Sequence, residues 1–535
     1  MLSLFLSVVG VGAVLAGEMF FNKKRIHCEV RIDTEGHEGH LGHLFHHNGV
    51  VDGLWTYSIE DIWAGLADCY ASLRANVQEK YGCEIENLAA IGISAMMHGY
   101  MAFDKNENIL VPFRTWRNTN TGPAAKELSQ LFNFNVPLRW SISHLYECIL
   151  EGNDHVGSID FFTTLAGYIH WQLTGRKVLG VGDASGMFPI DSATGSYNAA
   201  MVQAFDSLVA PKGYPWKILD ILPESLPAGA PAGVLTAEGA LKIDPSGHLQ
   251  AGIPLCPPEG DAGTGMVATN AVRQRTGNVS AGTSSFSMIV LEKELSNPNE
   301  MIDMVTTPDG SPVAMVHCNN CTSDLNGWVG LFKEYEAILG MEVDSGAIFS
   351  RLFAAADKGD ADCGGLISYN YVSGEPVTGF SEGRPLFVRS ATDKFNLSNF
   401  MRSILYGTVC ALKAGNDFLL KDEGVKVDRI TGHGGLFTVK GVGQRVLAAA
   451  LNSPISVMET AGEGGAWGIA LLAAYEVSNS EGLSLPDYLD AKVFAGNEGE
   501  SISPSAEDVA GFDRYMEGYM KGLAIERAAV ENKAL

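Results

Sequence analysis

Segments with the patterns of strands and helices alternate along both halves of this chain, and that alternation constrains the fold more than any single motif does. Residues 58–82 begin with Ser, carry Glu in the first turn, repeat apolar residues at helical spacing and end in Gly, which predicts a capped helix. Residues 88–104 follow as an apolar strand, a loop and a second strand. Similar patterns recur at 161–175, 279–292, 396–420 and 465–477. The sequence therefore predicts α/β domains.

The size and charge of the chain limit the classes of protein to which it can belong. A chain of 535 residues is too long for one hydrophobic core, so at least two domains are expected. Hydrophobic residues make up 46% and charged residues 19%, which is typical of a folded globular protein. The formal net charge of −25 disfavours nucleic acid and anionic membranes as partners. A bound phosphate must therefore be held by local donors and metal.

The nine cysteines are scattered along the chain. This pattern argues against a secreted disulfide framework and favours reduced thiols in a cytoplasmic protein. Cys318 and Cys321 form a single C-x-x-C pair with no second pair to complete a zinc site. We expect both thiols to pack in the core.

The first residues, MLSLFLSVVGVGAVLAG, form a continuous apolar run. A signal peptide is one interpretation, with Val14 and Ala16 suited to a cleavage site, although no basic residue precedes the run. The run falls short of the roughly 20 apolar residues that a membrane-spanning helix needs. A buried first strand is the third interpretation. Residues 1–25 are therefore treated as an atypical N-terminal segment, with export as the alternative to a cytoplasmic location.

A histidine cluster follows, made of His37, His40, His43, His46 and His47. Spacings of three and four residues are compatible with metal binding. The intervening glycines and the strand-like residues that follow favour a turn with solvated histidines.

Asp261 is a lone carboxylate between Gly260 and a small-residue segment that can run as a helix. A carboxylate at a helix N-terminus feels the positive end of the helix dipole and stays ionised. Such a group can accept the proton of a substrate hydroxyl as its oxygen attacks phosphorus. The alternative is that Asp261 is only a helix N-cap.

A hydroxyl-rich hairpin follows, with its turn at Ala281 and Gly282. Gly282 would let phosphate oxygens approach the backbone, and Thr283 and Ser284 add hydroxyl donors. An ordinary hairpin turn is the alternative.

Glycines also cluster at 432–435 and 462–468, where a nucleotide could lie on exposed backbone or the chain could simply turn from strand to helix. The sequence MMHG at 96–99 leaves His98 at a strand end, where ligands of α/β sheets collect. A structural histidine is the alternative there.

The order of the motifs is more specific than any one of them. AMMHGYMAFD, RTWRNTNT, LTGR, GDASGMFPID, GDAGTGMVATN, SAGTSS, HGGLFTVKGVGQ and GEGGAWGIALLAAY follow one another along the chain. This series resembles the FGGY family of carbohydrate kinases, and most closely its xylulokinase-like members, from about Trp55 to the last helix.

The resemblance implies a two-domain, actin-like (ribonuclease H-like) ATPase fold with an interdomain cleft. Residues 26–272 would form the sugar-binding domain and residues 273–535 the nucleotide-binding domain. By resemblance, Asp261 is the catalytic base and also contacts the sugar. The remaining sugar contacts would be Met97, His98, Trp116 and Asn118. The ATP contacts would be Gly282, Thr283, Ser284, Gly434, Gly435, Gln444, Gly464 and Gly465.

Two regions depart from the family's pattern. Asn118 stands where the family often has Asp, which removes a charged acceptor and can change the preferred sugar. The family opens with a strand and an Asp-x-Gly-Thr type phosphate loop, and the segment 17–25 has no such turn. Phe20 and Phe21 lie where small residues are expected, and Glu18 is the only acid nearby.

The resemblance predicts an ATP-dependent kinase that phosphorylates a primary hydroxyl of a sugar, with a ketopentose such as xylulose or ribulose expected. ATP and Mg²⁺ are the expected cofactors, and no protein residue is assigned as a metal ligand. Two alternatives remain, a sugar-binding pseudokinase without the first phosphate loop and a sugar-independent ATPase of the same fold. The identity of the sugar and the assembly state, for which a homodimer is considered, stay open.

Overall fold

The computed structural model describes the backbone of residues 3–9, 14–21, 24–31 and 48–51, and residues 53–341, 344–458, 464–496 and 499–533 with their side chains. The chain divides into two compact units. Unit 1 consists of residues 1–272, 304–313 and 463–495, and unit 2 consists of residues 273–303, 314–462 and 496–535. The sequence predicts two contiguous domains, whereas two segments of the second half fold with unit 1.

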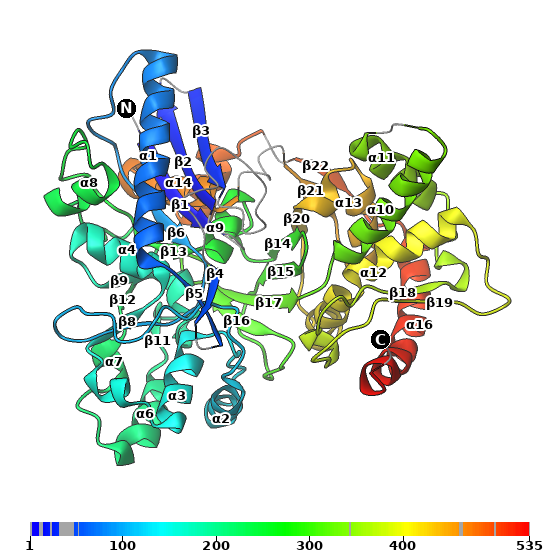
Figure 1. The fold of residues 1–535 in the computed structure, drawn as a ribbon, viewed down its shortest axis with the longest axis horizontal. Helices are drawn as coiled ribbons and strands as arrows, with labels where there is room; N and C mark the ends of the chain where they lie inside the picture. The colour runs from blue at the N-terminus through cyan, green and yellow to red at the C-terminus, as the bar shows by residue number, and fades with distance from the viewer. Residues whose placement is uncertain are drawn as a thin grey trace. The chain divides into compact units, whose positions relative to one another are not determined.

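Unit 1 contains a five-stranded sheet in the order β13-β6-β1-β2-β3 (Figure 1). Its first strand pairs antiparallel with the second and parallel with β6, which in turn pairs parallel with β13. The strands of this sheet are β1 (Ser3–Val9), β2 (Val14–Phe21), β3 (Lys24–Arg31), β6 (Ile93–Ala95) and β13 (Glu259–Gly260). The carboxyl end of β13 leads directly to Asp261.

Residues 1–25, treated from sequence as a separate segment, supply two strands of this sheet and the start of a third. A boundary after residue 25 would cut through β3. Within the apolar run, Ser3–Val9 pairs along its whole length with β2, from Ser3 opposite Phe20 to Val9 opposite Val14, which explains why it forms a strand. The histidines at 37–47 lie outside the described residues.

Unit 1 also contains helices and strands outside this sheet. Its further helices are α1 (Ile59–Tyr81), α2 (Gly122–Phe132), α3 (Ser141–Glu151), α4 (Leu165–Thr174), α5 (Val181–Ala184), α6 (Ala199–Val209), α7 (Ile218–Ile221), α8 (Ala237–Ile243), α9 (Asp261–Ala268), α14 (Gly464–Ser478) and α15 (Leu485–Tyr488). Its further strands are β4 (Asn48–Val51), β5 (Leu54–Tyr57), β7 (Met101–Phe103), β8 (Phe161–Thr163), β9 (Val178–Gly180), β10 (Ile190–Asp191), β11 (Ser196–Tyr197) and β12 (Glu224–Leu226).

Helices α1 and α14 are among those that pack on the sheet of unit 1. Helix α1 packs on β2 and β3, and α14 packs on β1, β2 and β6 and on α9 (Figure 1). The caps of α1 are those that the sequence predicts, because the Ser58 side chain accepts a hydrogen bond from the Asp61 N–H and Gly82 ends the helix in a left-handed conformation. A Cβ atom on Gly468 would clash with the Thr264 carbonyl, so glycine permits the close contact between α14 and α9.

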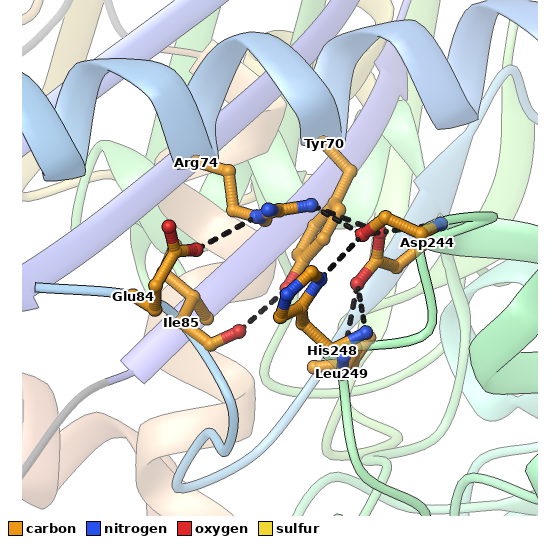
Figure 2. A network of polar contacts seen from close by, with 8 residues as sticks. Tyr70, Arg74, Glu84, Ile85, Asp244, His248 and Leu249 are labelled. Atoms are coloured by element: carbon orange, nitrogen blue, oxygen red, sulfur yellow. Dashed lines mark hydrogen bonds and ion pairs between the residues drawn. The ribbon is translucent and has the colours of Figure 1, made fainter.

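A polar network fixes α1 to the segment after α8 (Figure 2). Arg74 pairs with Glu84 at 3.2 Å and with the buried Asp244 at 3.3 Å. The second carboxylate oxygen of Asp244 accepts hydrogen bonds from the N–H groups of His248 and Leu249, both at 2.9 Å. Burial acts to raise the pKa of Asp244, but hydrogen bonds from Ser246 and from the Leu249 N–H, together with the Arg74 charge, bring it below the ordinary value. The network is structural and lies apart from the residues that the sequence predicts for chemistry.

The second sheet, most of whose strands belong to unit 2, has the strand order β16-β17-β15-β14-β20-β21-β22. Its strands are β14 (Thr276–Ala281), β15 (Ser285–Val290), β16 (Asp303–Thr306), β17 (Pro312–Cys318), β20 (Arg429–His433), β21 (Ile455–Val457) and β22 (Glu500–Ile502). The unit also contains β18 (Ile367–Tyr369), β19 (Leu386–Val388), α10 (Ser323–Ile338), α11 (Ser345–Ala356), α12 (Leu397–Asp417), α13 (Val442–Leu451) and α16 (Ala506–Glu531). Strand β14 pairs antiparallel with β15 and parallel with β20, as β1 does with β2 and β6. The two sheets therefore repeat one core topology.

Two further expectations concern the thiols and the membrane. Cys318 and Cys321 are both buried, which confirms the prediction that they pack in the core. Among the described residues, no helix combines the length and the apolar character needed to cross a membrane.

Candidate active site

Asp261 is the first residue of α9, directly after the short strand β13. Gly260 is the N-cap, so the interpretation of Asp261 as a simple N-cap does not hold. Its Oδ1 atom accepts hydrogen bonds from the N–H groups of Met97 and Ala262, both at 3.0 Å. Within the described part of the chain, its Oδ2 atom has no hydrogen-bond partner. One oxygen is therefore fixed and the other can take a proton.

The environment of Asp261 suits a general base. The side chain is partly buried, and burial raises its pKa above the ordinary value for Asp, in opposition to the two backbone hydrogen bonds. A raised pKa makes a carboxylate a stronger base, and it remains ionised once the pH exceeds that pKa. The geometry thus provides an accessible carboxylate oxygen on a fixed support.

Met97 and His98 lie beside this carboxylate, in the loop after β6. The N–H of Met97 makes one of the bonds to Asp261, so backbone rather than side chain carries that contact. His98 adopts a left-handed backbone conformation (φ 70°), and its Nδ1 lies 3.2 Å from the Gly186 carbonyl oxygen. Since a carbonyl only accepts, Nδ1 carries the proton and Nε2 is the acceptor nitrogen. The ring also stacks on Trp140, with ring centroids 6.3 Å apart.

Trp116 and Asn118 lie on a turn next to β5. The Asn118 Oδ1 accepts from the Trp55 N–H at 2.8 Å, and its NH₂ group donates to the carbonyls of Trp55 and Thr115 at 2.9 and 3.0 Å. These bonds occupy both NH₂ hydrogens of a buried side chain, so Asn118 holds the turn in place. Trp116 remains partly exposed, with the Arg117 guanidinium over its ring.

The second group of predicted residues lies in unit 2, at the turn between β14 and β15. The carbonyl of Gly282 accepts from the Thr322 N–H at 3.0 Å and from its hydroxyl at 2.7 Å, and the Thr283 carbonyl accepts from the Cys321 N–H at 2.9 Å. The backbone N–H and hydroxyl groups of Thr283 and Ser284 make no hydrogen bond among the described residues. Anchored carbonyls and unpaired donors are the pattern of a phosphate-binding loop.

Gly434 and Gly435 lie next to this hairpin, because β14 and β20 run parallel and end side by side. A Cβ atom on Gly434 would lie 2.7 Å from the Ala281 carbonyl oxygen, and the residue has φ 99° and ψ −176°, a conformation open only to glycine. The structure therefore brings these two glycine segments together at the carboxyl ends of parallel strands, where ligands of α/β sheets bind.

The other predicted ATP contacts, Gln444, Gly464 and Gly465, lie on helices. The Gln444 side chain is buried and donates to the carbonyls of Ile455 and Glu500 at 3.1 and 2.7 Å, which links α13 to β21 and β22. Gly464 and Gly465 begin α14, which packs in unit 1 on β1 and α9. The expectation of a contiguous second domain differs from the structure here, because a helical pattern does not specify which sheet the helix covers.

Sequence reasoning missed two buried carboxyls beside Asp261. Asp183 and Glu259 are 0% and 1% exposed, and burial raises the pKa of each to about 8. Their only sequence signal is an acid amid small residues, in GDASGM and PPEGD. Among the described residues, no group of His, Cys, Asp or Glu has a geometry that would hold a metal ion.

Two models of known protein domains together match most of the length of this chain. The N-terminal domain of the FGGY family of carbohydrate kinases matches residues 45–267, and the C-terminal domain of that family matches residues 277–477. A xylulose kinase from Haemophilus influenzae is 21% identical over 453 residues, which cover 81% of this chain and 84% of the relative.

Two solved structures with similar folds are a xylulose kinase from Rhodospirillum rubrum and a gluconate kinase from Lactobacillus acidophilus. Both superpose with a TM-score of 0.74, at 18% and 15% identity. The first comparison covers 98% of both chains, and the second covers 99% of this chain and 98% of the other. These likenesses confirm the mixed α/β, two-unit, actin-like ATPase fold.

Proposed function

Because the chain belongs to the FGGY family of carbohydrate kinases, we propose that it transfers the γ-phosphoryl group of ATP to a primary hydroxyl of a ketopentose such as xylulose or ribulose. Its relative from Haemophilus influenzae is a xylulose kinase, which supports that sugar class. The observation that carries the proposal is the carboxylate of Asp261, which has one oxygen fixed by the Met97 N–H and the other without a partner in the described residues.

Asp261 acts as the general base in this proposal. Its Oδ2 accepts the proton of the sugar hydroxyl as that oxygen attacks the γ-phosphorus. The bond between the γ-phosphorus and the bridging oxygen breaks, ADP leaves with that oxygen, and the proton on Asp261 then passes to solvent. The Nε2 atom of His98 accepts a hydrogen bond from the sugar, with Nδ1–H directed to Gly186. Trp116 offers an apolar face to the sugar ring or chain.

The hairpin of unit 2 holds the phosphates. The N–H and hydroxyl groups of Thr283 and Ser284 donate to phosphate oxygens, and the glycines at 434 and 435 leave room for the nucleotide. Magnesium belongs to the nucleotide substrate, which enters as MgATP. Its charge neutralises the phosphates and stabilises the charge that develops on the leaving ADP. This fits a protein of strong net negative charge, since the anion is held by backbone dipoles and its own counterion.

Release of ADP by the purified protein with MgATP, measured across ketopentoses, aldoses, polyols and aldonates, tests the proposal. A ketopentose should raise turnover well above the rate without sugar, and Asp261→Ala should lower kcat by about 10²- to 10⁴-fold, the usual contribution of a general base. Sugar-independent ATP hydrolysis would instead favour an ATPase, and sugar binding without turnover would favour a pseudokinase.

A further inference from the structure

Two buried carboxyls next to the proposed base take no part in the chemistry described above. Glu259 lies two residues before Asp261 on β13, and Asp183 is on the short helix α5. Neither forms an ion pair with Lys or Arg among the described residues, and carboxyls are rarely buried without such a partner. Their contacts show what holds them there.

Glu259 joins β13 to the first turn of α5. Its Oε1 accepts from the Gly182 N–H at 3.2 Å and its Oε2 from the Asp183 N–H at 2.9 Å. A Cβ atom on Gly180 or on Gly182 would clash with this carboxyl group, so the glycines before and within α5 leave the space that it fills. The side chain of Glu259 thereby fixes the strand that ends at Gly260.

Asp183 contacts the backbone immediately before the base. The Thr164 hydroxyl donates to its Oδ2 at 2.7 Å, whereas its buried Oδ1 has no hydrogen-bond partner in the described structure. That Oδ1 lies 3.0 Å from the position that a Cβ atom on Gly260 would occupy. The Met97 side chain packs on the same position, at 3.0 and 3.1 Å. Gly260 is therefore enclosed by Asp183 and by the residue whose N–H binds Asp261.

The charges near this pair determine which carboxyl ionises. Burial, and to a smaller extent the nearby Asp261 carboxylate, raises the pKa of Asp183 to about 8, in opposition to the Thr164 hydrogen bond. Burial and the charge of Asp183 raise the pKa of Glu259 to about 8. The other titratable groups around the pair are Tyr197, Cys256 and His98, of which Tyr197 and Cys256 have raised pKa values and are uncharged. Burial therefore favours the uncharged form of both Asp183 and Glu259.

We propose that Asp183 and Glu259 are positioning residues that hold the β13–α9 junction, so that Asp261 meets the sugar hydroxyl in a reactive geometry. This inference rests on the proposed kinase function. The pair acts through Gly260 and does not touch the substrate. Because burial favours the uncharged form of both side chains, they support Asp261 without placing a second negative charge near it.

Kinetics of two Asp183 variants test this role. Asp183→Ala should lower kcat by about 10²-fold, the effect of misplacing a reacting group by about 1 Å, with the KM for sugar little changed. Asp183→Asn keeps the shape and the Thr164 bond, and should restore most of kcat at pH 7. In the parent protein kcat/KM should fall above about pH 8, where Asp183 ionises and places a second negative charge near Asp261; Asp183→Asn should lack that fall. An unchanged kcat in Asp183→Ala, or the same alkaline fall in Asp183→Asn, would overturn the proposal.

Hydrogen exchange separates this proposal from the kinase assignment. The N–H groups of Met97 and Ala262 both bind Asp261, and in Asp183→Ala they should exchange faster without ATP or sugar. Glu238→Gln, a change at an exposed position in α8, is the control and should leave both unchanged. If Asp183→Ala does not fold, Glu259→Gln takes its place, because its NH₂ group would face one of the two N–H donors. Unaltered exchange overturns the positioning role even if the kinase is active, and absence of turnover with every sugar overturns only the kinase assignment.

Discussion

The two candidate sites of this protein use different kinds of chemical group. At Asp261, the chemistry depends on ionisable side chains that are wholly or partly buried, and burial raises the pKa of all three carboxyls. At the hairpin that contains Thr283 and Ser284, the donors are backbone N–H groups and neutral hydroxyls, and no charged side chain takes part in the anchoring bonds. One site uses titratable groups, and the other uses fixed dipoles.

The difference follows from what each site has to bind. Removing a proton requires a base whose pKa is tuned, and burial is the simplest way to tune it. Holding phosphate requires several donors directed at one point, which a turn with anchored carbonyls provides without any net charge. We therefore expect changes near Asp261 to alter rates and pH profiles, and changes at the hairpin to alter nucleotide affinity.

The largest effect is expected at the hairpin, from the double variant Thr283→Ala/Ser284→Ala. Loss of two hydroxyl donors to charged oxygens should raise the KM for ATP by at least about 10²-fold, since such hydrogen bonds contribute about 1.5–3 kcal/mol each. The pH at which kcat/KM rises should stay that of the parent protein, because Asp261 is untouched. Initial rates at varied ATP and pH give both quantities.

Ser350→Ala is the matched control for the double variant. Ser350 is exposed on α11 in the same unit, and its hydroxyl bonds only within its own helix. The Ser350→Ala variant should have the same KM for ATP as the parent protein. If the hairpin variant shifts the pH at which kcat/KM rises, the hairpin also affects the base, which would contradict the separate roles of the two sites.

A smaller effect is expected in unit 1, where the Asn118 side chain makes hydrogen bonds to backbone groups. Asn118→Asp would place a carboxylate against the carbonyls of Trp55 and Thr115, to which the NH₂ group now donates. Each carbonyl keeps a backbone N–H donor, so the loss is that of the two amide hydrogen bonds, about 1–3 kcal/mol of folding free energy together. Thermal unfolding at pH 7 should show a lower Tm for this variant.

Asn120→Asp controls for the added charge, because Asn120 is exposed on the same turn. Its Tm should stay close to that of the parent. If both variants have the same Tm and Asn118→Asp changes only the choice of sugar, then Asn118 is a substrate contact and not a structural residue.

Local features of this fold could be predicted from the sequence. Helix α1, with Ser58 and Gly82 at its ends, depends on hydrogen bonds between residues close in the chain. The hairpin around Gly282 and the helix that begins at Asp261 follow from equally local patterns. The family resemblance then placed these segments in the right fold, which the comparisons confirm.

Contacts between distant segments could not be predicted. The bonds from Glu259 to α5 join residues 76 and 77 positions apart, and those from Asn118 to Trp55 join residues 63 positions apart. Neither spacing leaves a periodic signal. The small-residue pattern of α14 indicates close packing but does not name its partner, and α9 in unit 1 supplies it.

The smallest effect is expected at Thr322, which anchors the hairpin through hydrogen bonds to the Gly282 carbonyl. Its hydroxyl donates to the Gly282 carbonyl at 2.7 Å, and its N–H donates to the same oxygen at 3.0 Å. Thr322→Val removes the hydroxyl, keeps the shape and leaves the N–H bond, so the loss should be about 0.5–1.5 kcal/mol. If the carbonyl anchors direct the donors of Thr283 and Ser284, the KM for ATP should rise by a few fold while kcat and the pH profile stay unchanged. A fall in kcat at unchanged KM would mean that the hairpin also acts in the chemical step, and the contrast between the two sites would then have to be abandoned.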